Sequence, residues 1–395
     1  MAAARKTAII CTNDAWTLYH FRGSLMRALQ QRGFDVIAAG PRDRHAALVE
    51  KMGVEFAHIP MDWSGLNPAR ELVTLWHLYR LYRRTRPALV HHFSHKAILY
   101  GSLAARFAGV PGIVNTVNGL GSTLGEAEGL LKRLQPLIIA LMRFALRPPV
   151  RVTFQNADIR DFYLDRSIVR PEQMSLILGS GIDTRKFTPG AKDLATRQVQ
   201  FLMFSRMLWA KGVAEYCQAA EIVGKDNTLA DKPRFTLVGG ADPGNQSGVD
   251  QVWLSNPQTI PGDWLVDQAA RGFVNWRSHQ ENMLPILGGA DVVVLPSYYP
   301  EGVPRSLLEA MSCGRAIITT DTPGCRDVVE HGVNGLLVKP RDAEDLARAM
   351  ATLAADPERV AEMGKASRRL VSEKFSDERI IDQTFATYGL AGVTV

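Results

Sequence analysis

Two glutamates, Glu301 and Glu309, lie on either side of a predicted helix start in residues 295–311, a segment that reads as strand, loop and helix. Pro304 suits the first turn of this helix, because the N–H that proline lacks would have no partner there. The other amides of the first turn and the helix dipole attract anions such as a diphosphate. Carboxylates accept hydrogen bonds from vicinal diols, so the pair fits a nucleoside diphosphate sugar. A capping Glu301 and a solvated Glu309 are the structural alternative.

Two basic residues form a second cluster, in the loop at residues 205–212 that follows a predicted strand. Arg206 offers a planar fork of donors and Lys211 a point charge, and both could converge on phosphate oxygens at the carboxyl end of the strand. A solvated surface loop is the alternative.

The elements that must position these residues alternate between strand and helix along the chain. Apolar runs such as residues 7–11, 35–39, 234–238 and 291–296 are followed by helical stretches, the first of them expected near residues 22–32. This alternation predicts parallel sheets. The alternation weakens near residue 188 and then restarts. We therefore predict two domains, 1–188 and 189–395, with the final helix free to pack back on the first. Two such domains would face each other across a cleft at the carboxyl ends of their strands, where ligands bind in open α/β sheets.

The composition is that of a folded protein, with 395 residues of which 46% are apolar and 22% charged. Four cysteines without ligand spacing argue against a disulfide framework and a structural zinc site. The sequence lacks a dinucleotide-binding glycine turn, an Asp-x-Asp pair, a P-loop, a zincin helix and a serine-hydrolase elbow. It also lacks a signal-peptide core and a membrane-spanning run, which predicts a cytoplasmic protein.

The net charge of +6 is unevenly distributed, because residues 1–183 hold 23 basic and 14 acidic side chains and the rest hold 23 and 26. Two helix candidates in the basic half combine cations with large apolar side chains, as helices at anionic membrane surfaces do. The cations that we assign to a membrane surface are Arg80, Arg83, Arg84, Lys132 and Arg133. For each helix the alternative is a core-facing helix with a solvated basic face. No nucleic-acid-binding module is visible, so no nucleic-acid partner is expected.

Together these motifs resemble glycosyltransferase family 4, whose members are retaining enzymes of the two-domain GT-B fold. The resemblance rests on the E-x7-E spacing of Glu301 and Glu309, the R-x4-K spacing of Arg206 and Lys211, and the Leu-Val-Gly-Gly run at residues 237–240. Residues 19–22, 66–68, 95–96 and 118–122 more narrowly resemble the bacterial branch that adds N-acetylgalactosamine to undecaprenyl-diphosphate-linked sugars. The resemblance implies two doubly wound, Rossmann-like α/β domains, the first binding the acceptor and facing the membrane, the second binding a UDP-sugar.

The resemblance also implies a role for each matching position. Glu301 contacts hydroxyls of the donor sugar and Glu309 the ribose diol. Arg206 and Lys211 contact the diphosphate, and with Glu301 they form the implied catalytic set. Further donor contacts are implied at Gly239, Gly240, Asn275, Trp276, Arg277, Gly302, Val303 and Pro304. Acceptor contacts are implied at Tyr19, Arg22, His95, Lys96 and Asn118.

In the reaction of this family the leaving diphosphate is thought to accept the proton of the acceptor on the same face of the sugar. Catalysis then consists of positioning and charge stabilisation. We therefore expect no side-chain nucleophile, no cofactor and no metal. Many family members have histidine where this chain has Asn118, which cannot titrate.

The resulting hypothesis is a peripheral enzyme on the inner face of the cytoplasmic membrane. It would transfer N-acetylgalactosamine from a UDP-sugar to undecaprenyl-diphosphate-linked N,N'-diacetylbacillosamine. A capsule or O-antigen transferase that uses another hexose is one alternative. A GT-B-fold UDP-sugar 2-epimerase, which needs no acceptor, and a non-catalytic membrane-binding module are two more.

Overall fold

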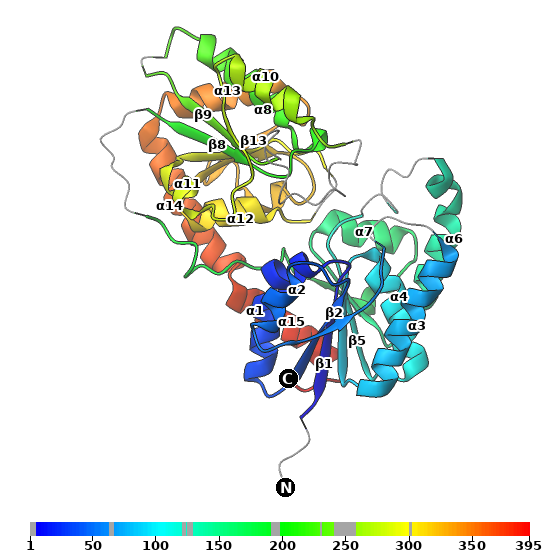
Figure 1. The fold of residues 1–395 in the computed structure, drawn as a ribbon. Coiled ribbons are helices and arrows are strands. Elements are labelled where there is room, and N and C mark those ends of the chain that lie inside the picture. Colours follow the sequence, from blue (N-terminus) through cyan, green and yellow to red (C-terminus); the bar gives the residue numbers. More distant parts are fainter. Residues whose placement is uncertain are drawn as a thin grey trace. The chain divides into compact units, whose positions relative to one another are not determined.

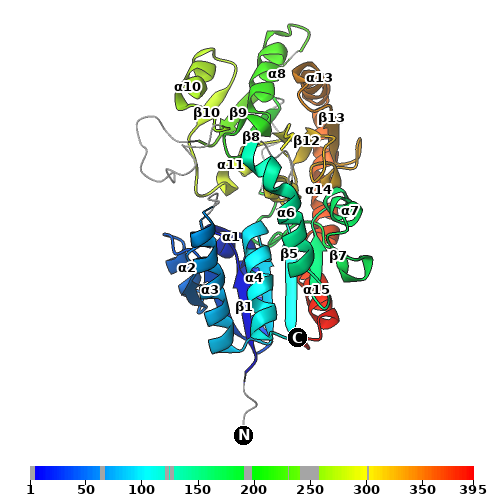
Figure 2. The ribbon, with the colours of Figure 1, turned by 90° about the vertical axis from the view of Figure 1, so that its right-hand side faces the viewer.

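The computed structural model divides into two α/β units (Figures 1 and 2) and describes residues 5–62, 67–120, 124, 129–190, 198–229, 231–240, 258–299 and 302–395. Unit 1 consists of Met1–Gly181 and Asp377–Val395, and unit 2 of Ile182–Ser376. The division at Gly181 precedes the predicted boundary at residue 188. The amide of Ile182 already donates to the carbonyl of Phe375 in unit 2, at 3.0 Å.

Seven parallel strands form the sheet of unit 1, in the order β3-β2-β1-β4-β5-β6-β7. They are β1 (Thr7–Cys11), β2 (Asp35–Gly40), β3 (Glu55–His58), β4 (Leu89–Phe93), β5 (Gly112–Val117), β6 (Arg151–Phe154) and β7 (Met174–Leu176). Because β1 pairs with both β2 and β4, the strand order reverses there. Ligands bind beyond the carboxyl ends of the strands at such a switch point.

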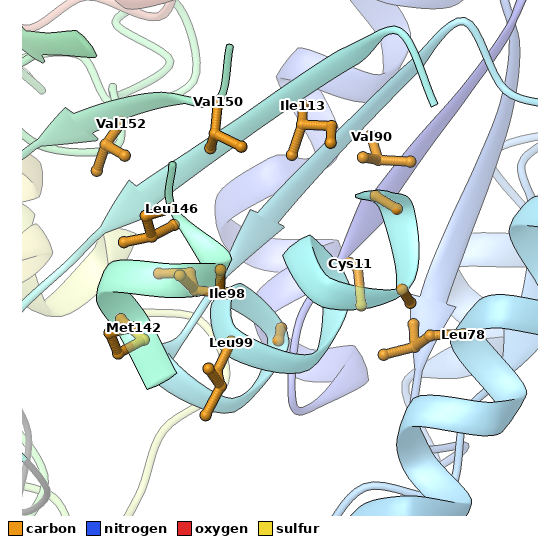
Figure 3. Packing of buried hydrophobic residues seen from close by; sticks show 14 of the residues in the cluster. Cys11, Leu78, Val90, Ile98, Leu99, Ile113, Met142, Leu146, Val150 and Val152 are labelled. Carbon is orange, nitrogen blue, oxygen red and sulfur yellow. The ribbon is translucent and has the colours of Figure 1, made fainter. Parts of the chain in front are cut away.

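Helices cover both faces of this sheet (Figure 1). One face carries α3 (Pro68–Thr85), α4 (His95–Ala108), α6 (Gly129–Ala145) and α7 (Ala157–Asp165). The other carries α1 (Ala15–Gln31), α2 (Ala46–Glu50) and α15 (Asp377–Leu390). Figure 3 shows part of the core under the first face, where Cys11, Val90 and Ile113 of the strands lie among side chains of α3, α4 and α6.

Side-chain caps fix where several helices begin. Asp14 accepts a hydrogen bond from the amide of Thr17 at 2.6 Å and so starts α1. Asn67 accepts from the amide of Ala69 at 3.0 Å, and Pro68 follows at the first position of α3.

The chain returns to unit 1 at its end, because α15 packs against α1 and β5. The buried hydroxyl of Tyr388 lies 2.8 Å from Nδ1 of His91 on β4, and the hydroxyl of Ser24 donates to the carboxylate of Asp377 at 2.5 Å. Burial lowers the pKa of His91 well below its usual value, so this imidazole is neutral.

Unit 2 has a six-stranded parallel sheet in the order β10-β9-β8-β11-β12-β13. Its strands are β8 (Gln200–Phe204), β9 (Arg234–Val238), β10 (Asn275–Arg277), β11 (Val292–Leu295), β12 (Ala316–Thr320) and β13 (Gly335–Val338). Its α-helices are α8 (Val213–Lys225), α10 (Gly262–Ala270), α11 (Leu284–Gly289), α12 (Arg305–Ser312), α13 (Ala343–Ala354) and α14 (Pro357–Lys374). The switch point lies between β8 and β11, where the cation-bearing and glutamate-bearing loops begin. Both units thus have the predicted doubly wound α/β architecture.

Among the described residues, no helix combines the length and the apolar character needed to cross a bilayer.

Candidate active site

The two predicted phosphate-binding cations converge on one aromatic ring in unit 2. The guanidinium carbon of Arg206 lies 5.8 Å and Nζ of Lys211 5.3 Å from the ring centroid of Tyr299. Lys211 is only 5% exposed, whereas Arg206 is exposed. The fixed position of Lys211 beside the carboxyl end of β8 suits it to hold an anion with little reorganisation.

Backbone contacts hold the two loops that carry these residues together. The amide of Tyr298 donates to the carbonyl of Ala210 at 2.9 Å, which joins the loop after β11 to the loop after β8. Gly212 has φ +78°, and a Cβ there would lie 2.2 Å from the carbonyl oxygen of Pro296. Only glycine permits this approach, so the junction requires a glycine directly after Lys211.

The glycine pair at the end of β9 serves a similar close approach. Gly239 has φ +140°, and a Cβ there would lie 2.2 Å from the carbonyl oxygen of Ser205. Trp276 donates its indole N–H to the carbonyl of Gly239 at 2.9 Å, and Gly239 donates its amide to the carbonyl of Arg277 at 3.0 Å. The predicted donor-binding residues Gly239 and Gly240, just beyond β9, therefore lie beside Asn275 to Arg277 on the edge strand β10.

Helix α12 presents its amino end after the loop that contains Tyr299. Pro304 is the N-cap of this helix, one position before the first turn in which the sequence placed it. Amides of the first turn of a helix have no partner within the helix, so this end of α12 can receive an anion. Gly302, Val303 and Pro304 are all buried.

Glu309 lies on the second turn of α12 and accepts a hydrogen bond from Nε of Arg305 at 3.2 Å. The two side chains are 17% and 20% exposed. Burial raises the pKa of Glu309, and the charges of Arg305 and Lys186 offset part of that rise. Glu301, the other predicted carboxylate, lies outside the described residues.

In unit 1 the structure brings two predicted acceptor residues into contact. Arg22 on α1 is 5% exposed and donates from Nη2 to Oδ1 of Asn118 at 3.2 Å, just beyond β5. Its guanidinium carbon lies 3.8 Å from the ring centroid of Phe93 at the end of β4. Tyr19 lies one turn earlier on α1 and is half-buried. Arg22 thus holds Asn118 at the carboxyl end of β5.

His95 and Lys96 are the first two residues of α4, and their side chains have different surroundings. Nε2 of His95 is enclosed and has no hydrogen-bond partner in the described part of the chain. Burial lowers the pKa of His95 to about 4, so the ring is neutral at physiological pH. Lys96 forms an ion pair with Glu71 on α3, so its charge is already compensated within unit 1.

Ser94, just before α4, has φ +76° and ψ 147°. This conformation costs a non-glycine residue on the order of 1–3 kcal/mol and recurs at functional sites. It lies at the switch point of the unit 1 sheet, next to His95.

Two contributors were not predicted from the sequence. Tyr299, which both cations approach, gave no signal beyond its place two residues before Glu301. The contact of Arg305 with Glu309 could have been predicted, because an arginine four residues before a glutamate in a helix lies on the same side of that helix. The described residues contain no group of three or more His, Cys, Asp or Glu side chains that could hold a metal ion. Metal-independent activity remains a prediction.

Sequence families match nearly the whole chain. Residues 23–186 match the family described as Glycosyltransferase Family 4, and residues 185–370 match Glycosyl transferases group 1.

Two curated relatives are similar over most of their length. The N,N'-diacetylbacillosaminyl-diphospho-undecaprenol alpha-1,3-N-acetylgalactosaminyltransferase of Campylobacter jejuni is 27% identical over 351 residues, which are 86% of this chain and 87% of that protein. The UDP-Gal:alpha-D-GlcNAc-diphosphoundecaprenol alpha-1,3-galactosyltransferase of Escherichia coli is 25% identical over 75% of this chain and 74% of its own.

Among solved structures, HepE of Anabaena in complex with UDP matches with a TM-score of 0.76 over 97% of this chain and 99% of its own, at 17% identity. At that identity the similarity concerns the fold.

Proposed function

The chain belongs to the glycosyltransferases of family 4 and has their GT-B fold, and on this basis we propose that it transfers N-acetylgalactosamine from UDP-N-acetylgalactosamine to an undecaprenyl-diphosphate-linked saccharide. The first candidate for that saccharide is N,N'-diacetylbacillosamine, which the Campylobacter relative carries in its name. Action on undecaprenyl-diphosphate sugars in general has wider support, since the two relatives described above are both named for such acceptors.

One observation carries the proposal: Arg206 and Lys211 converge on Tyr299, in the loop that leads into the amino end of α12. A diphosphate there would receive two cations and helix amides. Because Lys211 is buried, its charge acts in a medium that screens it poorly, which strengthens its interaction with a leaving group as negative charge develops.

The remaining donor contacts follow from this placement. Glu309 is suited to accept hydrogen bonds from the ribose diol, because a carboxylate has two acceptor oxygens with about four lone-pair sites and Nε of Arg305 uses one of them, on Oε1. We assign Glu301 to the hydroxyls of the transferred sugar, and residues 275–277 beside Gly239 to the base. Metal-independent transfer with retention of configuration completes the proposal, the diphosphate accepting the acceptor's proton.

The acceptor would bind at the carboxyl edge of the unit 1 sheet. Arg22 and Asn118 offer one guanidinium and one amide there, and His95 offers a neutral imidazole. A neutral ring can donate or accept a hydrogen bond with a saccharide hydroxyl. We propose that the enzyme works as a peripheral protein on the cytoplasmic face of the membrane, with Arg80, Arg83, Arg84, Lys132 and Arg133 attracted to anionic headgroups.

Product analysis tests this function. The protein is incubated with UDP-N-acetylgalactosamine, UDP-N-acetylglucosamine, UDP-galactose or UDP-glucose and with undecaprenyl-diphosphate-linked diacetylbacillosamine or N-acetylglucosamine. Mass spectrometry then follows the lipid. We expect extension of the first acceptor by N-acetylgalactosamine, sensitivity of the product to an α-specific hexosaminidase, and little extension by the Lys211→Ala control.

Two other results would redirect the assignment. Extension of the N-acetylglucosamine lipid by galactose would make the chain a functional counterpart of the Escherichia coli relative. Conversion of the UDP-sugar to its 2-epimer without any acceptor would contradict transfer altogether.

A further inference from the structure

Large apolar side chains gather on one exposed face of unit 1. Fourteen large hydrophobic side chains are exposed in the described part of the chain, and half of them belong to α3, α4 and α6. They are Leu72 (66% exposed), Val73 (46%), Trp76 (56%), Phe107 (64%), Leu137 (57%), Leu141 (40%) and Phe144 (41%). Water-exposed apolar groups at this density mark a surface that meets a partner.

The three helices are neighbours, so these side chains share one face. Helix α4 packs against α3 on one side and against α6 on the other, as Figures 1 and 2 show. A groove of about 520 Å³ runs between α3 and α4 and is lined by Leu72, Leu75, Trp76, Tyr79, Ala104 and Phe107. The lining contains no charged residue.

The charges around this face are almost all of one sign. Glu71 is the one acidic residue in the sequences of the three helices, and Lys96 neutralises it. On the exposed side of α3, Leu72, Val73 and Trp76 occupy the first half, and Arg80, Arg83 and Arg84 occupy the second. Helix α6 repeats the mixture, with Lys132, Arg133 and Arg143 beside its apolar stripe.

This pattern indicates what covers the face. Leucine and aromatic side chains framed by several arginines, on helices that carry one carboxylate, complement a bilayer, whose anionic headgroups lie next to hydrocarbon. A second copy of the same chain would bring its own cations against these, which is unfavourable.

We propose that the α3–α4–α6 face inserts its apolar side chains into an anionic lipid bilayer, and that the arginines alone do not account for membrane binding. The inference rests on the proposed function, since a lipid-linked acceptor requires a membrane. It deepens that function by naming the inserted residues. Salt screens the attraction between arginine and anionic headgroups, but it does not screen the burial of apolar surface. Part of the membrane binding should therefore persist at high salt.

Docking through this face also orients the acceptor site. Leu72 follows Glu71, which pairs with Lys96 in the first turn of α4, next to Ser94 and His95. The inserted half of α3 therefore lies at the same edge of unit 1 as the predicted acceptor residues, which places them close to a substrate held in the bilayer.

Vesicle binding tests the proposal. The full chain is sedimented with vesicles of phosphatidylglycerol and phosphatidylethanolamine, at about 0.15 M and about 0.5 M salt. Three proteins are compared: wild type, Leu72→Ser/Trp76→Ser/Phe107→Ser, and the control Leu164→Ser/Leu176→Ser/Leu390→Ser, whose residues are exposed elsewhere on unit 1. A fourth, Arg80→Ser/Arg83→Ser/Arg84→Ser, separates charge from insertion.

We expect the first triple variant to bind at least about 10-fold more weakly at both salt concentrations, since each apolar side chain contributes to burial. The arginine variant should lose up to roughly 100-fold at low salt and little more at high salt. The control should match wild type.

If the apolar variant binds like the control, or wild type is fully released at about 0.5 M salt, the proposal is overturned. It also fails if the apolar substitutions abolish self-association and leave vesicle binding unchanged.

A sugar-transfer assay in detergent distinguishes failure of this inference from failure of the proposed function. In detergent with a short-chain lipid-linked acceptor, the apolar variant should transfer sugar as wild type does, because none of its three residues is among the donor or acceptor residues proposed above. Vesicle binding by a wild-type protein that transfers no sugar would overturn the function and leave the insertion standing.

Discussion

Replacement of Glu309 by glutamine is expected to weaken UDP binding at least about 10-fold while unit 2 stays folded. The carboxylate is largely buried on α12 and is held by Nε of Arg305 at 3.2 Å. Glutamine keeps the size of the side chain and one oxygen that can accept the same hydrogen bond. What it removes is the charge and one of the two acceptor oxygens that a ribose diol would use.

The magnitude follows from the contacts that are lost. A hydrogen bond to a charged group contributes about 1.5–3 kcal/mol, against about 0.5–1.5 kcal/mol for a neutral one. The bond that is lost accounts for about 1.5–3 kcal/mol, which is roughly a factor of 10 to 150 in Kd, and the weakening of the second bond adds to it. Loss of the ion pair with Arg305 adds little to this difference, because water partly screens both side chains.

Calorimetry with two ligands separates the ribose contact from other effects. UDP and 2',3'-dideoxy-UDP are titrated into wild type, Glu309→Gln and the control Glu344→Gln, whose residue is exposed on α13. Wild type and the control should lose affinity when the diol is removed, and Glu309→Gln should lose clearly less, because only the weaker of the two bonds to the diol remains in this variant. Equal losses in all three proteins would mean that Glu309 does not contact the ribose. Glu301→Gln should leave UDP binding nearly unchanged and impair transfer.

The same pair of proteins gives a test by pH. Burial raises the pKa of Glu309 above its usual value. As the pH falls toward this raised pKa, the side chain gains a proton and comes to resemble glutamine. The ratio of the wild-type affinity to that of Glu309→Gln should therefore shrink on acidification, while titration of the phosphates cancels between the two proteins. A ratio that grows on acidification would contradict the assignment.

Three further outcomes are expected. Arg206→Ala or Lys211→Ala should lower kcat by roughly 100-fold or more, the scale of a lost electrostatic donor, and wild-type turnover would exclude these residues from the mechanism. EDTA should spare turnover, and a loss that Mn²⁺ or Mg²⁺ restores would refute the proposed charge balance. Tyr388→Phe leaves a buried nitrogen of His91 without its partner and should lower the free energy of unfolding by about 1–3 kcal/mol, whereas unchanged thermal unfolding would show that the bond contributes nothing.

The sheets could be predicted from the sequence because their strands are continuous apolar runs. Val292–Leu295 and Thr7–Cys11 are buried on both faces, as strands of parallel sheets are, and both were predicted within a residue or two. The start of α1 was placed near Arg22 rather than at Ala15. The capping side chain of Asp14 was the available signal, and the aromatic residues that follow it obscured the helical period.

In the candidate site, too, features set by residues close in sequence could be predicted, whereas features set by the packing of distant segments could not. The shared location of Arg206 and Lys211 depends on one short loop at a strand end and could be predicted, and both lie beside the Tyr299 ring. The pairing of Lys96 with Glu71 could not, because it joins two helices whose packing the sequence does not specify. Lys96 was expected to contact the acceptor, and in the structure its ammonium is paired with Glu71. The acceptor role of Lys96 remains a prediction.

The return of α15 to unit 1 has a consequence for biosynthesis. Its residues Phe385 and Tyr388 cover a face of the first sheet that includes Leu89, Phe93 and Val114. A ribosome adds about 5–20 residues per second, so unit 2 delays the arrival of α15 by roughly 10 to 40 seconds after the strands of unit 1 have emerged. Throughout that interval the nascent chain carries an uncovered apolar face, on which a chaperone can bind. A chain truncated before Asp377 would keep that face exposed permanently and is expected to aggregate, even though every strand of both sheets is present.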